Sequence, residues 1–146
     1  MDVKRIGMRT SADRPGREEV STEQDTIAMM ILNWAKSTFG PVAFDPAERA
    51  ARLLEEAAEV AQAMGVKPEV ARAIVGRTYS RPVGEVDKEV GGVLVCAYSI
   101  CALIGKSPAE ALYEECNRVT GRDRSEWVAK HEEKVKDGTA NVSVVR

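Results

Sequence analysis

The sequence predicts an all-α fold, built as a bundle of four to five helices. Apolar residues recur at helical spacing in several segments, and no convincing strand pattern appears before residue 141. Aromatic residues make up only 5% of the chain, whereas alanine and glutamate, which favour helices, are abundant. At 146 residues, the chain is long enough for one domain with its own core.

The chain divides into one helical domain with a tail at each end. Residues 1–22 carry several basic side chains but no helical or strand period, so we expect a flexible arm, solvated unless its charges meet phosphates. The helical domain is expected over residues 23–138. The tail 139–146 would stay loose, or its residues 141–146 would pair as a short strand.

Three helices are predicted in the first half of the domain. The first covers residues 26–38 and ends at a glycine–proline pair. The second covers residues 46–64, with Asp45 placed to cap its first turn, a proline at its first position and a glycine after its end. A shorter third helix covers residues 68–79.

The second half of the domain contains the most hydrophobic helix, predicted over residues 85–104 and expected to be central and mostly buried. Gly91 and Gly92 lie inside it, and each costs roughly 1 kcal/mol against alanine. We therefore expect another backbone to approach closely there. Two further helices are predicted over residues 107–117 and 125–136.

Charge and cysteine content restrict the partners and the compartment. The formal net charge of −2 gives no basic field for nucleic acid or an anionic membrane, so neither is expected as a partner. The three cysteines contain no CxxC pair and are expected to be free, buried thiols. No apolar run reaches the length of a bilayer span, and the N-terminus lacks the apolar segment of a signal peptide. We expect a cytoplasmic protein.

Three glutamates, Glu55, Glu56 and Glu59, lie on one flank of the second helix together with Arg52. Like charges at this spacing repel by roughly 0.2–0.5 kcal/mol per pair. A divalent cation would offset that repulsion, and Mg²⁺ takes oxygen ligands from a few carboxylates. The alternative is a solvated face on which these acids pair with basic neighbours such as Arg49.

A second acidic segment supplies Glu85 and Glu89, which share a helix face with position 92. If the two acidic helices pack antiparallel, Glu89 opposes Glu56 and Glu59 across the seam. Carboxylates that converge from facing helices are one way in which helical bundles build metal sites.

Read together, residues 48–62, 81–85 and 89–94 resemble the MazG-like all-α nucleotide pyrophosphohydrolases, and most closely the short versions found in phages and bacteria. The resemblance covers roughly residues 45–117. It implies Mg²⁺-dependent hydrolysis of a nucleoside triphosphate to monophosphate and pyrophosphate, with Mn²⁺ as an alternative metal. It also implies a homodimer or homotetramer in which helices of two subunits form the site.

The family pattern is an EExxE helix followed by an ExxD helix. By position, Glu56 and Glu59 match metal-binding acids of the first helix, Glu55 matches the preceding acid, and Glu89 matches the first acid of ExxD. Gly92 stands where the family has aspartate, which removes one ligand. Two replacements are open, namely water or an acid on the far side of Glu89.

That nearby acid is Glu85, which would shift the cation along the helix. The resemblance also implies that Glu55 or Glu56 orients the attacking water. It marks Asn117 as lying near the family's nucleotide-holding asparagine. Candidate phosphate contacts are Arg118, Lys130, Lys134 and Lys136, and Arg52 is a further candidate for substrate binding.

Several alternatives stay open from the sequence. The first is a non-catalytic nucleotide- or Mg²⁺-binding module with a degenerate site, and the second is a helical interaction protein whose acids only solubilise it. Hydrolysis of phosphoribosyl-ATP, by a similar helical core, is a third. Trp34 is expected in the core, with base stacking as the alternative, and His131 is expected to be exposed and without a catalytic role.

Overall fold

The computed structural model describes residues 22–140, which form six α-helices and one 3-10 helix and contain no strand. In chain order the elements are α1 (Glu23–Phe39), η2 (Gly40–Phe44), α2 (Pro46–Ala63), α3 (Pro68–Tyr79), α4 (Val86–Leu103), α5 (Pro108–Thr120) and α6 (Arg124–Lys136). The all-α prediction is therefore confirmed for these residues. The predicted arm, up to residue 21, and the predicted strand over 141–146 lie outside the described residues.

Side chains cap the helix starts that position the acidic segment. Asp45 Oδ1 accepts a hydrogen bond from the backbone N–H of Glu48 at 2.9 Å, as predicted for the start of α2. α1 begins earlier than predicted because Thr22 and Asp25 form a capping box. In it, Asp25 N–H donates to Thr22 Oγ1 at 3.1 Å and Thr22 N–H donates to Asp25 Oδ2 at 2.9 Å.

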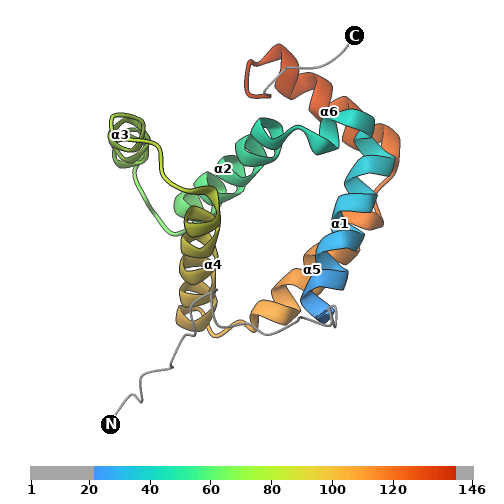
Figure 1. The fold of residues 1–146 in the computed structure, drawn as a ribbon, viewed down its shortest axis with the longest axis horizontal. Helices are drawn as coiled ribbons and strands as arrows, with labels where there is room; N and C mark the ends of the chain where they lie inside the picture. The colour runs from blue at the N-terminus through green and yellow to red at the C-terminus, as the bar shows by residue number, and fades with distance from the viewer. Residues whose placement is uncertain (1–21, 141–146) are drawn as a thin grey trace, which may run out of the picture.

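The helices form an open frame and not a closed bundle (Figure 1). One side of the frame contains α1, which packs against α6, and α5 lies on the same side in this view. α2 leads away from this side to α4 on the opposite side, and α3 stands outside the frame. Each of the six segments predicted to be helical is an α-helix, although the bundle was expected to contain four to five.

The buried core is small and lies where α1, η2 and α2 meet. The described residues that are less than a tenth exposed are Ala35, Thr38, Ala43 and Glu48. α6 is attached to this corner by Arg124, whose Nε donates to the backbone carbonyl oxygens of Ser37 and Thr38 at 3.2 and 3.1 Å. The end of α1 is thereby held against the start of α6.

The prediction that the helix over residues 85–104 is mostly buried is wrong for the single chain. None of the residues of α4 is buried, and Val95 and Leu103 are 71% and 76% exposed. The expected close approach at Gly91 and Gly92 is also missing, since a Cβ at either position would have no other heavy atom within 4 Å. The reason is that no other described helix packs along α4.

The cysteines do not behave as buried hydrophobes. Cys96 on α4 is exposed, and Cys101 and Cys116 are half-buried, although all three are free thiols as predicted. Cys96 is exposed because it belongs to the uncovered helix. Over residues 22–140, no single helix is both long and apolar enough to cross a bilayer. α4 and α5 meet that test only as a pair, bent by 102°.

Candidate functional site

One face of α2 changes from basic to acidic along its length. Arg49, Arg52, Glu56 and Glu59 follow one another at spacings of three and four residues, which places them in a row on the same side of the helix. At a rise of 1.5 Å per residue, the row is about 15 Å long. The chain therefore presents cationic groups near the start of α2 and carboxylates near its middle.

This face of α2 lines a pocket of about 470 Å³, whose other walls come from α1, α5 and α6. Its lining residues are Trp34, Phe39, Arg49, Arg52, Glu55, Glu56, Glu59, Glu115, Arg118, Val119, Trp127, Lys130, His131 and Lys134. Acidic, basic and aromatic side chains thus meet in one cavity. Residues more than fifty positions apart in the sequence contribute to it.

A buried carboxylate supports the basic end of the pocket. Glu48 is fully buried, and its Oε1 lies 3.0 Å from Arg52 Nε and 3.9 Å from His131 Nδ1. A buried charge is tolerated only when opposite charges or hydrogen bonds surround it. Glu48 therefore links α2 to α6 beneath the pocket.

The first acid of the trio, Glu55, is already paired. Arg52 donates to it through Nη1, and Lys134 Nζ lies 2.5 Å from its Oε2. The same Arg52 also donates to the backbone carbonyl oxygen of Thr139, just past the end of α6. Glu55 thus joins α2 to the C-terminal end of α6.

Glu56 and Glu59 differ from Glu55, because neither makes an ion pair with another residue of the described chain. Partial burial raises the pKa of Glu56, and the neighbouring charges of Glu59, Glu115 and Glu55 raise it further, while Lys134 lowers it. Repelling carboxylates at the wall of a cavity form a local excess of negative charge. A cation would relieve it.

The cationic wall opposite is built around Trp127. Arg122, Lys130 and Arg118 place their charged groups 4.8, 5.7 and 5.8 Å from the centre of its ring. The indole Nε1–H donates to the backbone carbonyl oxygen of Val119 at 3.0 Å, which fixes the ring between α5 and α6. The tryptophan therefore organises several cations of this wall.

Arg118 is also held by Glu115, one turn earlier on α5. Its Nε donates to Glu115 Oε2 at 2.7 Å, and its Nη2 donates to the second carboxylate oxygen. This contact lowers the pKa of Glu115 and raises that of Arg118. Arg118 is therefore already partly neutralised.

The aromatic part of the lining is a cluster of rings. Trp34 meets Trp127 edge to face at 5.7 Å and Phe39 edge to face at 6.0 Å. His131 lies 5.9 Å from Phe39. Trp34 is half-buried in this cluster, so it serves both in packing and as part of the pocket wall.

The structure brings together seven of the residues predicted for the site. Those that line the pocket are Arg52, Glu55, Glu56, Glu59, Arg118, Lys130 and Lys134. Asn117 is exposed and does not line it, although it precedes Arg118 directly.

Glu85 and Glu89 of the second acidic segment also lie outside the pocket of their own chain. α2 packs on η2 and meets α3, and it does not pack along α4 as the antiparallel arrangement requires. The Glu89 carboxylate instead folds back over Gly84, where a Cβ would be only 2.3 Å from its Oε1. Accordingly, residues 22–140 contain no group of three or more histidine, cysteine, aspartate or glutamate side chains placed to hold a metal ion.

Four further side chains of the pocket were not among the residues predicted for the site. Arg49, Glu115, Trp127 and His131 line it. The expectation that His131 is exposed is wrong, since its side chain is 20% exposed and faces the buried Glu48. Arg49 could have been predicted, because helical spacing places it in the same row on α2 as Glu59. The other three depend on how α5 and α6 pack, for which the sequence carries no local signal.

Comparison with protein-family models, with curated proteins and with solved structures finds no match to this chain. The chemistry of the pocket therefore carries the functional argument. A cavity with cations at one end and unpaired carboxylates at the other suits an anionic ligand that brings a divalent cation with it. Phosphate esters that bind Mg²⁺ are the commonest ligands of this kind.

Proposed function

We propose that this protein is a Mg²⁺-dependent nucleoside triphosphate pyrophosphohydrolase of the MazG-like all-α type. The observation that carries the proposal is the row on α2 in which Glu56 and Glu59 remain unpaired in a pocket that also contains Arg118, Lys130 and Lys134. The products would be a nucleoside monophosphate and pyrophosphate.

Glu56 and Glu59 fit a Mg²⁺ ion that retains water and phosphate ligands, because Mg²⁺ in phosphate-processing sites commonly takes only one or two protein carboxylates. The raised pKa of Glu56 fits a site whose carboxylates repel one another when no cation is near. When bound, Mg²⁺, or Mn²⁺ in its place, would withdraw charge from the phosphates. The chain itself contributes the position of the two carboxylates.

The cations of α5 and α6 would hold the phosphate chain. Lys130 and Arg118 lie at the wall around Trp127. Lys134 now contacts Glu55, so a bound phosphate would compete with Glu55 for the Lys134 ammonium group. Released from Lys134, Glu55 would keep its contact with Arg52 and would be, with Glu56, one of two carboxylates placed to orient a water molecule for attack on phosphorus.

The proposal includes a homodimer or homotetramer. α4 is the most apolar helix, yet most of its large side chains are exposed in the single chain, including Val86 at 76%, and Ile100 is only half-buried. Exposed apolar faces of this size typically mark association surfaces. A second copy covering α4 would also give Glu85 and Glu89 an acidic partner helix, which they lack within their own chain.

A second candidate function is a non-catalytic module that binds a nucleotide with Mg²⁺. Two observations favour it. Gly92 leaves an acidic position empty, and Glu89 is turned toward Gly84 and lies outside the pocket. Such a module would bind the metal–nucleotide complex without releasing pyrophosphate.

One experiment separates the two candidates. Purified protein is incubated with canonical and modified nucleoside triphosphates and Mg²⁺, and pyrophosphate release is measured beside nucleotide binding by calorimetry. The enzyme predicts turnover that Glu56→Gln abolishes and that Glu132→Gln, which removes an exposed charge on α6, leaves intact. Measurable binding without turnover of any nucleotide would select the binding module. A helical interaction protein would bind neither Mg²⁺ nor Mn²⁺ at millimolar concentration.

A further inference from the structure

The guanidinium of Arg49 is the cationic group of the pocket with the fewest partners. Arg49 makes no hydrogen bond and no ion pair with another residue of the chain that the structure describes, and its Nε is buried without an acceptor. A buried donor without an acceptor costs free energy in the folded protein. A ligand that supplies the acceptor is one explanation for such a group.

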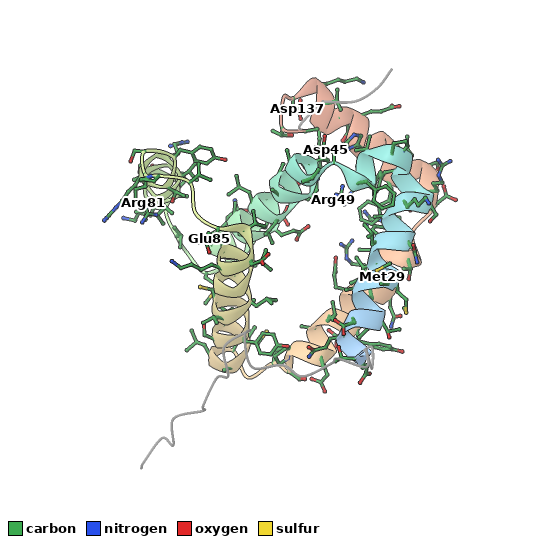
Figure 2. The ribbon with its side chains drawn as sticks, in the orientation of Figure 1. Met29, Asp45, Arg49, Arg81, Glu85 and Asp137 are labelled. Carbon is green, nitrogen blue, oxygen red and sulfur yellow. The ribbon has the colours of Figure 1, made fainter. Side chains whose placement is uncertain are left out.

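The position of Arg49 fits that explanation. It lies at the start of α2, on the side that faces α1 (Figure 2), and it lines the pocket together with Lys130 and His131. The nearby carboxylate, Glu48, is engaged with Arg52 at 3.0 Å. Burial lowers the pKa of Arg49, Glu48 raises it and Arg52 lowers it.

Lys130, the residue before His131, provides a second cation in the lining of the same pocket. Its ammonium group lies 5.7 Å from the centre of the Trp127 ring, and it makes no ion pair within residues 22–140. The remaining basic groups of the pocket are engaged: Arg52 and Lys134 with Glu55, and Arg118 with Glu115. The aromatic end of the pocket therefore carries positive charge that no protein carboxylate neutralises.

We infer that Arg49 and Lys130 form an anion subsite that binds a phosphoryl group without the help of a metal ion, at the end of the pocket opposite Glu59. The choice of a phosphoryl group over other anions rests on the proposed function. A guanidinium donates two parallel hydrogen bonds to phosphate oxygens, and Lys130 adds a point charge. The substrate would then lie along α2, with one phosphoryl group at Arg49 and the metal-bound part at Glu56 and Glu59.

Inorganic pyrophosphate without divalent cations is the probe that tests this subsite. Calorimetry should show binding to the wild-type protein, weakened about tenfold or more in Arg49→Gln, since charge-assisted hydrogen bonds are lost. Arg72→Gln removes the same charge from the exposed surface of α3 and should leave the affinity unchanged. Acetate should not compete with pyrophosphate. The inference is overturned by equal affinity in Arg49→Gln and wild type, by displacement with acetate, or by no binding to wild type.

A spectroscopic readout on the unmodified protein is independent of variant folding. The side-chain Nε–H signal of Arg49, identified by its loss in Arg49→Lys, should shift on titration with pyrophosphate. An unchanged signal at saturating pyrophosphate overturns the inference. The melting temperature of Arg49→Gln should equal or exceed that of wild type, because Arg49 donates no hydrogen bond within residues 22–140.

Turnover measurements separate this inference from the proposed function. If wild type hydrolyses a nucleotide and Arg49→Gln has the same KM, the proposed activity is supported and the proposed Arg49 subsite is rejected. If pyrophosphate binds through Arg49 and wild type hydrolyses no nucleotide, the proposed subsite is supported and the proposed activity is rejected.

Discussion

Lys134 Nζ lies 2.5 Å from Glu55 Oε2, and this contact between residues 79 positions apart joins α2 to α6. Glu55 is therefore an ion-paired residue of the α2–α6 contact as well as a member of the acidic trio. The pairing distinguishes it from Glu56 and Glu59, whose positions in the motif look equivalent in the sequence. It also supplies a measurable link between helix packing and the proposed site.

A double-mutant cycle on Glu55→Gln and Lys134→Gln should give a coupling free energy of about 0.5–1 kcal/mol, because the pair is only partly shielded from water. Equilibrium unfolding in urea measures it. Lys136→Gln, on the exposed last turn of α6, is the matched control and should show no coupling to Glu55→Gln. Coupling of zero for the Lys134 pair would contradict this role.

Glu56 should make the stability of the protein depend on pH. Because burial and neighbouring carboxylates raise its pKa, the fold favours the protonated form. The resulting stabilisation is fully present below the ordinary carboxyl pKa and is lost as pH rises through the raised value. Glu56→Gln should therefore have a higher melting temperature than wild type at neutral pH. The gain in free energy of unfolding should be less than about 1 kcal/mol after solvent screening, and the difference should vanish in acid.

Thermal melts across this pH range test the prediction, with Glu132→Gln as the variant whose curve should parallel wild type. Millimolar Mg²⁺ should reverse the order of Glu56→Gln and wild type, because only the ionised carboxylate binds the cation. A variant less stable than wild type at neutral pH in the absence of metal would contradict the direction of the pKa shift.

Glu48→Gln should destabilise the chain by about 3 kcal/mol, because it removes a buried charge from between Arg52 and His131. The free energy of unfolding in urea measures the loss. Glu69→Gln, on the exposed side of α3, should change it by less than about 0.5 kcal/mol. Equal effects of the two substitutions would show that the buried network contributes nothing.

Gly92→Asp should increase the affinity for Mg²⁺, because it restores an acid where the resemblance implies one. The structure accommodates the side chain, since a Cβ at Gly92 would meet no other heavy atom within 4 Å. Gly91→Asp adds the same charge one position away, on a different face of α4, and should leave the affinity near that of wild type. Calorimetric titration with Mg²⁺ decides, and equal affinities for both variants would contradict the prediction.

Val95→Asp should reduce self-association, because it places a charge on the exposed apolar surface of α4. Sedimentation velocity measures the change in mass distribution. Ala109→Asp adds the same charge at the start of α5 and is the matched control. A wild-type protein that sediments as a monomer at every concentration would contradict the proposed oligomer.

The local structure of this chain was largely predictable, whereas the placement of its helices was not. Periodic apolar residues and the Asp45 cap located α2 to within a residue or two. The Thr22–Asp25 box is also a local signal, and it starts α1 earlier than the apolar period alone predicts. These features depend on neighbours along the chain.

Burial and pairing depend on distant segments, and there the sequence predictions failed. α4 was expected to be buried because it is hydrophobic. Hydrophobicity indicates that a helix is stabilised by a covering surface, but it does not indicate which segment or which chain provides that surface. His131 was expected to be exposed because its sequence neighbours are charged, and α2 brings Glu48 against it. The separation of Glu89 from Glu56 has the same cause, because it is set by the angle between α2 and α4.

The chain contains two tryptophans, Trp34 and Trp127, and both line the pocket. All indole emission of the protein therefore originates in one pocket, which the groups proposed to hold phosphate and metal also line. Light that excites tryptophan alone would report on occupancy of this cavity without a label. A change in quenching on addition of nucleotide would thus follow the pocket and not the exposed helices α3 and α4.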